Sequence, residues 1–225
     1  ENASAADSLG FEAALRTTKE QDTLAQSCVQ VVDHIAKDMS GLCVLFGSWC
    51  QATHLVGSDL DVALVFKLAG GEIRRDKTMQ QHLLRRFAQK AVKRGFRLIE
   101  EIFTAAVPIV RMLFQHAGLA IEVDVSIGTS DTGTVDDFIR ERVQAQPRAQ
   151  RLIRLVKFWA RQREINKAVF GCLNSLSWTL LVFFFITSLG DVSMTYPLMD
   201  FLRCIERFGR IPDSSKAVRP FEGKF

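Results

Sequence analysis

Apolar residues follow two different spacings along this chain, and the change comes near residue 133. Before it, short apolar runs bounded by glycine or polar residues predict β-strands at residues 42–46, 62–66, 97–104, 109–114 and 120–126. Apolar positions three and four apart predict helices in the same part, over residues 76–94 and within residues 8–37, where we expect a break near 17–22. After residue 133 the spacing predicts helices at residues 136–145, 148–163, 174–189 and 197–208. The pattern therefore predicts an α+β fold, in which a sheet is followed by a mainly helical part.

Glycine and small polar residues mark where the predicted elements are joined. Residues 128–133, Gly-Thr-Ser-Asp-Thr-Gly, form the clearest linker, and residues 69–72 and Gly118 mark tighter turns. We therefore expect one domain over residues 21–132 and a second, helical domain made of residues 1–20 and 133–225.

The first predicted strand ends abruptly at Gly47, which is followed by Ser48. Glycine lets a backbone turn sharply and come close to a bound group, and serine adds a hydroxyl. We expect a short helix over residues 48–55 to begin here, with its first N–H groups directed at an anion. This pattern predicts half of a nucleotide-binding site.

Two acidic residues, Asp59 and Asp61, open the second strand with one residue between them. Side chains two apart in a strand share a face, so the two carboxylates repel each other unless a cation neutralises them. Mg²⁺ suits such a pair, because it binds a few carboxylates together with substrate phosphates. The strand at 120–126 offers a third acid, since Glu122 and Asp124 share one of its faces, and Asp124 is the better candidate. The alternative for an isolated Asp-x-Asp is a solvated strand end.

Composition narrows the class of protein without choosing a function. The chain has 225 residues, 48% of them hydrophobic, and a net charge of +4 that is compatible with an acidic substrate such as a nucleotide or RNA. Its five cysteines are scattered without a Cys-x-x-Cys pair, which argues against a disulfide framework or a zinc site. The longest apolar run, residues 178–186, is too short for a membrane span, so we expect a buried helix and no membrane partner.

Basic residues gather on or beside the helix predicted at 76–94. They form either an RNA-facing surface or the solvated face of an amphipathic helix. The residues are Arg74, Arg75, Lys77, Arg85, Arg86, Lys90, Lys93 and Arg94.

Gly47-Ser48, the Asp59 and Asp61 pair and the later strand with Asp124 together resemble the nucleotidyltransferase superfamily that shares the polymerase-β palm. Within it, residues 40–190 are most similar to the non-canonical poly(A) polymerases and terminal uridylyltransferases, especially the trypanosomal uridylyltransferases. The resemblance implies a palm, which is a mixed sheet with flanking helices, and a mainly helical second domain, with the active-site cleft between them. It also implies that Asp59, Asp61 and Asp124 are catalytic and bind Mg²⁺, with Mn²⁺ as the alternative ion.

The resemblance also implies nucleotide contacts. Lys157 and Arg161, four apart on one helix, would clamp the β- and γ-phosphates, although the spacing also fits a solvated stripe. Ser177 would meet the triphosphate and Trp178 would stack on the base, unless Trp178 belongs to an apolar core. Arg111 either lies near the metals or pairs with an acid. The full set of implied nucleotide-binding residues is Gly47, Ser48, Ser58, Lys157, Arg161, Ser177 and Trp178.

Two departures from the resembling family concern the sugar and the base. Relatives usually place an asparagine after the strand of the third carboxylate, near the ribose, where this chain has Gly133-Thr134-Val135-Asp136. The relatives' distal base-recognition loop is also not evident before Phe225. The contacts to the ribose and the base are therefore left open.

The function expected from the resemblance is that of an enzyme, an RNA uridylyltransferase in RNA processing or editing. It would add UMP from UTP to RNA 3′ ends by two-Mg²⁺ catalysis and release pyrophosphate, with an RNA-processing complex as a further partner. The alternatives are a poly(A) polymerase that uses ATP, a nucleotidyltransferase acting on small molecules or making short oligonucleotides, and an inactive RNA-binding subunit. The resembling uridylyltransferases imply a mitochondrial location, with the cytoplasm as the alternative.

Overall fold

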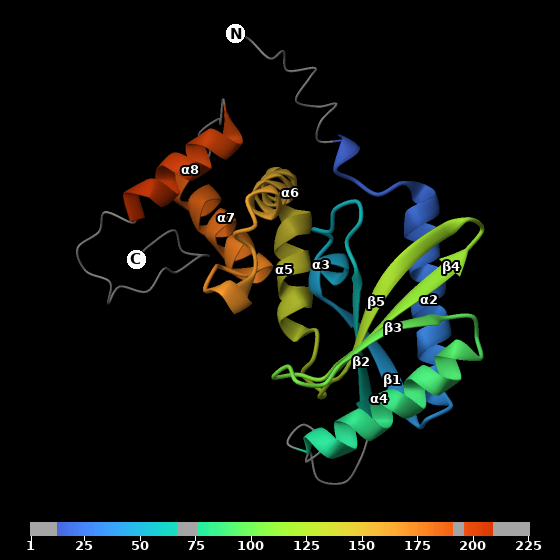
Figure 1. Ribbon diagram of the computed structural model, residues 1–225. Helices are drawn as coiled ribbons and strands as arrows, with labels where there is room; N and C mark the ends of the chain where they lie inside the picture. The colour runs from blue at the N-terminus through green and yellow to red at the C-terminus, as the bar shows by residue number, and fades with distance from the viewer. Residues whose placement is uncertain (1–12, 67–75, 191–195, 209–225) are drawn as a thin grey trace. The chain divides into compact units, whose positions relative to one another are not determined.

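The computed structural model describes residues 13–66, 76–190 and 196–208 (Figure 1). The turn predicted at 69–72, and Arg74 and Arg75, lie outside the described residues. The chain forms two compact units, one of residues 16–142 and one of residues 1–15 with 143–225. The domain boundaries predicted after residues 20 and 132 stay predictions, and so does the cleft between the domains.

The first unit is built on a five-stranded mixed sheet (Figure 1). The spatial order of its strands is β1-β2-β5-β4-β3, with β2 and β5 parallel and the other neighbours antiparallel. All five strands predicted from the apolar runs are present, with ends that differ by a few residues. They are β1 (Gly41–Phe46), β2 (Leu60–Phe66), β3 (Arg97–Ile102), β4 (Ile109–His116) and β5 (Leu119–Ile127).

Two helices, α2 (Lys19–Lys37) and α4 (Lys77–Val92), pack against this sheet (Figure 1). The break predicted near 17–22 is the start of α2, where Thr18 and Gln21 form a capping box by exchanging hydrogen bonds. The side chain of Asp76 accepts a hydrogen bond from the backbone at the start of α4.

The apolar core of this unit lies between the two helices and one face of the sheet. Val32 of α2, Phe87 of α4, and Val62 and Val123 of the inner strands are each fully buried in it. Burial of a side chain of this size contributes about 1.5–3 kcal/mol. Because side chains alternate along a strand, residues between these core positions point to the opposite face of the sheet.

The short helix after β1 is the clearest difference from the sequence prediction. We expected a helix over residues 48–55, but α3 (Gly47–Cys50) has a single turn. Ala52 adopts φ +57°, a left-handed conformation, and the N–H of Thr53 bonds to the carbonyl oxygen of Ser48. This backbone conformation and this hydrogen bond turn the chain away from the helix axis, so residues 51–59 form a loop leading to β2.

The remaining elements are helical, and all of them except the short η2 were predicted. They are α5 (Thr134–Ala145), α6 (Pro147–Gln162), η2 (Ala168–Phe170), α7 (Ser175–Leu189) and α8 (Pro197–Phe208). In the second unit the rings of Trp159 and Phe201 pack edge-on against Trp178, with centroids 5.8 and 6.4 Å away. The apolar run 178–186 lies in α7 and is largely buried, as expected. Among the described helices, none combines the length and the apolar character that crossing a membrane requires.

Candidate active site

The turn between β1 and α3 is the first feature of the candidate site. Gly47 has φ +69°, a conformation that residues with a β-carbon rarely adopt. A β-carbon at Gly47 would also lie 3.0 Å from Asp61 Cγ and overlap its Oδ2 atom. The carboxyl group of Asp61 therefore lies directly against the glycine backbone, and only glycine fits at this position.

Asp61 and Asp124 are neighbours because β2 and β5 run parallel and pair these two residues. Both alternate with core residues such as Val62 and Val123, so both lie on the face turned away from α2 and α4. Asp124 is only 9% exposed. Two carboxylates at paired positions repel each other, and this arrangement needs a compensating positive charge.

Asp59 lies one residue before β2 begins and is exposed. Asp59 is therefore outside the strand in which we expected it, and its sharing a face with Asp61 stays a prediction. Its charge still acts on Arg111, together with those of Asp124 and Glu122. Asp59 thus contributes to the negative potential beside Asp124.

Arg111 supplies the positive charge next to Asp124. It faces Asp124 across the β4–β5 pair, and its Nε and Nη2 atoms donate to Asp124 Oδ1 and Oδ2, each at 2.8 Å. These hydrogen bonds raise the pKa of Arg111 above its usual value, against an opposing effect of burial, and the charges of Asp124, Asp59 and Glu122 raise it further. The structure thus shows the pairing with an acid that the sequence left open, and because that acid is Asp124, a position of Arg111 near the metals stays a prediction.

The fit of these residues to a divalent cation depends on their donor atoms. Within residues 13–66, 76–190 and 196–208, no three His, Cys, Asp or Glu side chains are grouped closely enough to hold a metal ion. Carboxylate oxygens are nevertheless the ligands that Mg²⁺ prefers, and the strand register pairs Asp61 with Asp124. An ionised carboxylate has about four lone-pair sites, so Asp124 keeps acceptor capacity beside its two bonds to Arg111. The two carboxylates are therefore donors of the kind that Mg²⁺ prefers, and Mg²⁺ binding stays a prediction.

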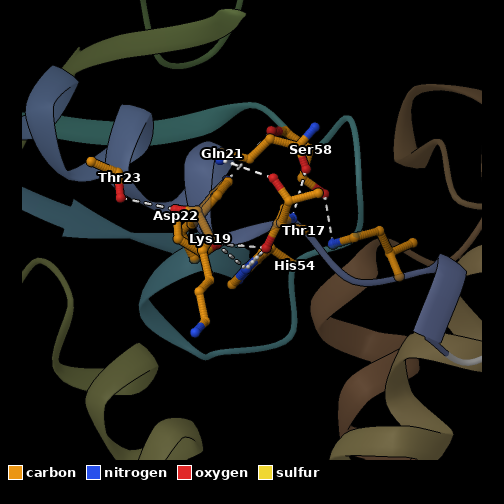
Figure 2. Close-up of polar contacts among 10 residues, drawn as sticks. Thr17, Lys19, Gln21, Asp22, Thr23, His54 and Ser58 are labelled. Carbon is orange, nitrogen blue, oxygen red and sulfur yellow. Dashed lines mark hydrogen bonds and ion pairs between the residues drawn. The ribbon is translucent and has the colours of Figure 1, made fainter.

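The loop between α3 and Asp59 is held by Ser58 and by the start of α2. Figure 2 shows Ser58, His54 and Thr17 within one group of polar contacts. Ser58 Oγ accepts the N–H of Leu55 at 3.0 Å, and His54 Nε2 lies within hydrogen-bond distance of Thr17 Oγ1 at 3.1 Å. The imidazole of His54 stacks on Trp49 with ring centroids 3.8 Å apart. The structure thus gives Ser58 a role in shaping the loop, and its predicted nucleotide contact stays a prediction.

Two basic residues on or just after α4 form ion pairs within the first unit. Arg85 pairs with Glu101 at 3.1 Å, and Arg94 pairs with Asp38. These contacts are typical of a solvated face that is tied to the sheet and to α2. The RNA-facing surface suggested for this helix stays a prediction.

The predicted phosphate- and base-binding residues of the second unit lie on α6 and α7. Lys157 and Arg161 are one turn apart on α6, as the spacing predicted, and Lys157 is 9% exposed whereas Arg161 is exposed. The N–H and the hydroxyl of Ser177 both donate to Asn174 Oδ1, which caps α7. Trp178 is 6% exposed, and its burial favours the core interpretation. The nucleotide contacts of all four residues stay predictions.

Comparison with known proteins assigns the chain to a family. The family model described as "Poly(A) RNA polymerase, mitochondrial-like, central palm domain" matches residues 7–132, which is more than half of the chain. The chain belongs to this family. The matched range includes the Gly47 turn and all three candidate carboxylates.

Two curated relatives show how much of a longer protein this palm represents. The chain is 29% identical over 143 residues to Poly(A) RNA polymerase protein 2 of Saccharomyces cerevisiae, covering 63% of this chain and 23% of the relative. It is 31% identical over 144 residues to human Terminal uridylyltransferase 4, covering 63% of this chain and 8% of the relative. The chain therefore spans less than a quarter of each of these relatives.

Solved structures share the fold of this palm family. The mtPAP structure in complex with UTP matches with a TM-score of 0.67 at 18% identity, covering 82% of this chain and 42% of that chain. A structure of the Cid1 poly(U) polymerase matches with a TM-score of 0.65 at 18% identity, covering 79% and 53% respectively. At these identities the likeness concerns the fold, and it confirms the polymerase-β-like palm expected from the sequence.

One contact of the palm was missed by the sequence analysis. Asp136 Oδ1 accepts hydrogen bonds from the N–H of Gly47 at 3.1 Å and from Gln51 Nε2 at 2.7 Å. The Gly47 N–H is therefore bonded to a carboxylate of the protein. The N–H groups that we expect to face an anion are those that follow it, from Ser48 onward. The only indication in the sequence was an acidic residue in the first turn of the helix after the linker. Acidic residues are common at this position in helices, so the pattern does not indicate which group Asp136 contacts.

Replacing Arg111 by methionine should lower the free energy of unfolding by about 2–3 kcal/mol, because two charge-assisted hydrogen bonds are lost and Asp124 stays buried without its cation. Urea denaturation measures the change. The matched control is Lys37→Met, which removes a 2.6 Å pair with Asp33 on the surface of α2 and should cost about 0–1 kcal/mol. Equal stability of the two variants would show that the Arg111 pair contributes no more than a surface ion pair.

Proposed function

We propose that this chain carries the catalytic palm of an RNA terminal nucleotidyltransferase that adds UMP from UTP to RNA 3′ ends and releases pyrophosphate. One observation carries the proposal: paired strands hold Asp61 beside Asp124, and Asp61 lies against the Gly47 turn. A carboxylate pair next to a serine-bearing turn fits the two parts of the reaction, the metal-bound triphosphate and the attacking hydroxyl. Family membership supports the same reaction class.

In the proposed reaction the 3′ oxygen of RNA forms a bond to the α-phosphorus, and the bond from that phosphorus to the bridging oxygen of the pyrophosphate breaks. Asp59 and Asp61 would hold two Mg²⁺ ions, and Asp124 would share the one nearer the RNA. Bound Mg²⁺ supplies charge neutralisation at the triphosphate and acidifies the hydroxyl nucleophile. Asp124 would accept the proton of the 3′ hydroxyl and pass it to solvent.

The protein's own groups would position these reactants. Arg111 holds both oxygens of Asp124, so it fixes the direction in which this carboxylate meets the hydroxyl. Ser48 would contact the nucleotide from the turn after β1, with Ser58 in the following loop. Lys157 and Arg161 would bind the β- and γ-phosphates, Ser177 the triphosphate and Trp178 the base.

UTP is the proposed substrate and ATP the second candidate, because the relatives include both a terminal uridylyltransferase and a poly(A) polymerase. The test is extension of a short single-stranded RNA with each of the four nucleoside triphosphates and Mg²⁺. We expect extension from UTP, and loss of all extension when EDTA removes the metal. Competition among the four nucleotides then ranks them, and preferential labelling from ATP would overturn the choice of UTP.

Two other outcomes would change the class of function. Product formed without an RNA primer would point to a small-molecule or oligonucleotide substrate. RNA binding that weakens with salt, without any metal-dependent turnover, would point to a binding subunit. The proposal further places the protein in a mitochondrial RNA-processing complex, with the cytoplasm as the alternative location.

A further inference from the structure

Asp136 and the Gly47 turn are in contact although 89 residues separate them in the sequence. Asp136 lies in the first turn of α5, which runs beside α3 (Figure 1). The same oxygen, Oδ1, accepts the N–H of Gly47 at 3.1 Å and the side-chain amide of Gln51 at 2.7 Å. The half-buried carboxylate thus binds both ends of the single turn that forms α3.

A second set of hydrogen bonds closes a ring around this turn. Gln51 is 6% exposed, and its amide oxygen accepts the hydroxyl of the fully buried Thr53 at 3.3 Å. The N–H of Thr53 in turn donates to the carbonyl oxygen of Ser48 at 2.9 Å. Gly47 has no side chain that could pack, so hydrogen bonds such as these must hold the turn, and Asp136 is the member that comes from another element.

The position of Gly47 matters for Asp61 because the two are in direct contact. The space where a β-carbon of Gly47 would lie is filled by the Asp61 carboxyl group. A shift of the Gly47 backbone would therefore change the room available to Asp61. It would also move Ser48, the next residue along the turn.

We propose that Asp136 is a positioning residue, which fixes the Gly47–Ser48 turn for the nucleotide and, through Gly47, the carboxylate of Asp61. This inference rests on the proposed function. Asp136 acts as a hydrogen-bond acceptor through one oxygen, and an asparagine offers an equivalent oxygen in the same place. The role therefore depends on the acceptor atom and not on the negative charge.

The test compares Asp136→Ala and Asp136→Asn with the wild-type chain, at a temperature where all three are folded. Asp136→Ala should lower kcat/KM for the nucleotide by about ten- to a hundredfold, because a hydrogen-bond acceptor for a buried amide is lost. KM should rise because Ser48 is displaced from the nucleotide. The value of kcat should fall because the carboxylate of Asp61 is displaced. Asp136→Asn should stay within about threefold of wild type, since it keeps the acceptor.

The matched control is Asp137→Ala. Asp137 is the neighbouring acid on α5, and it pairs with Arg140 at 2.8 Å and accepts from the Cys50 thiol, without contact to Gly47. Its replacement should leave kcat/KM within about threefold of wild type, as expected for a surface pair. A loss in Asp137→Ala equal to that in Asp136→Ala would overturn the proposal.

A second measurement needs no activity. Hydrogen exchange of the Gly47 amide, followed by NMR, should be slow in wild type and in Asp136→Asn, and faster in Asp136→Ala. A rapidly exchanging Gly47 amide in wild type would overturn the proposal even if Asp136→Ala did not fold. Loss of activity in Asp136→Asn with the amide still protected would also overturn it, because charge would then be what matters. If the wild-type chain shows the expected exchange pattern but no nucleotidyl transfer, the proposed function is refuted. The hydrogen bond from Gly47 to Asp136 is then still supported.

Discussion

Asp61→Ala should abolish nucleotide incorporation while the fold stays intact. Asp61 lies against the Gly47 turn and is paired with Asp124 in the register of β2 and β5, so it links the two halves of the proposed site. Metal-assisted charge stabilisation is worth several kcal/mol, and each 1.4 kcal/mol is about tenfold in rate, so the loss should reach about a thousandfold or more. Primer extension measures the loss, and circular dichroism with urea denaturation checks the fold. Stability should be unchanged or slightly raised, because one of two neighbouring like charges is removed.

The matched control for this prediction is Glu122→Ala. Glu122 lies on β5 two residues before Asp124, 4.0 Å from Arg111, and its side chain is 54% exposed. Its removal deletes one carboxylate from the same strand face without touching Gly47 or Asp61. We expect activity within about threefold of wild type, as for most exposed charges. A folded Asp61→Ala protein with activity equal to that of Glu122→Ala would refute the assignment of Asp61.

Gly47→Ala should have the next largest effect, on both stability and activity. The left-handed backbone costs alanine about 1–2 kcal/mol, and overlap with Asp61 adds about 1–3 kcal/mol of overpacking. We expect the free energy of unfolding to fall by about 2–5 kcal/mol and primer extension to fall by about a hundredfold, since Asp61 must move. Urea denaturation and primer extension on the same preparation measure both.

Gly118→Ala separates the two causes. Gly118 lies in the β4–β5 turn with φ +79°, and a β-carbon there would meet nothing within 4 Å. Alanine at this position should lower the free energy of unfolding by about 1–2 kcal/mol, through the left-handed backbone alone, and should leave activity unchanged. If the two variants lost equal stability and Gly47→Ala stayed active, the contact between Gly47 and Asp61 would have no importance for the site.

The sequence predicted the strands and most helices because each depends on apolar spacing that the core enforces. It also predicted that Gly47, Asp61 and Asp124 belong together, since a glycine turn after one strand and acids on two other strands are features of local sequence. Trp178 shows the limit of such reasoning. An aromatic residue in an apolar helix fits both a core and a base-stacking surface, and only packing decides where the ring lies.

Three features depend on particular hydrogen bonds that the sequence pattern does not indicate. The length of α3 was overestimated because the bond from Thr53 to Ser48 ends it after one turn. The pairing of Arg111 with Asp124 needs the β4–β5 register, which leaves both interpretations of this arginine open until the partner strand is known. The bond from Gly47 to Asp136 joins the end of β1 to the start of α5, 89 residues later, and nothing local to either residue indicates it.

The pairing of the strands places five residues in one row across the sheet: Phe46, Asp61, Asp124, Arg111 and Glu100. A shift of any inner strand by one residue would exchange its two faces, and would bury Asp61, Asp124 or Arg111 among the apolar side chains under α2 and α4. Single-residue insertions or deletions in β2, β4 or β5 would therefore remove the site and the core together. Changes of length that keep the site are therefore expected only in the loops of this palm, whereas the three inner strands should tolerate substitution alone.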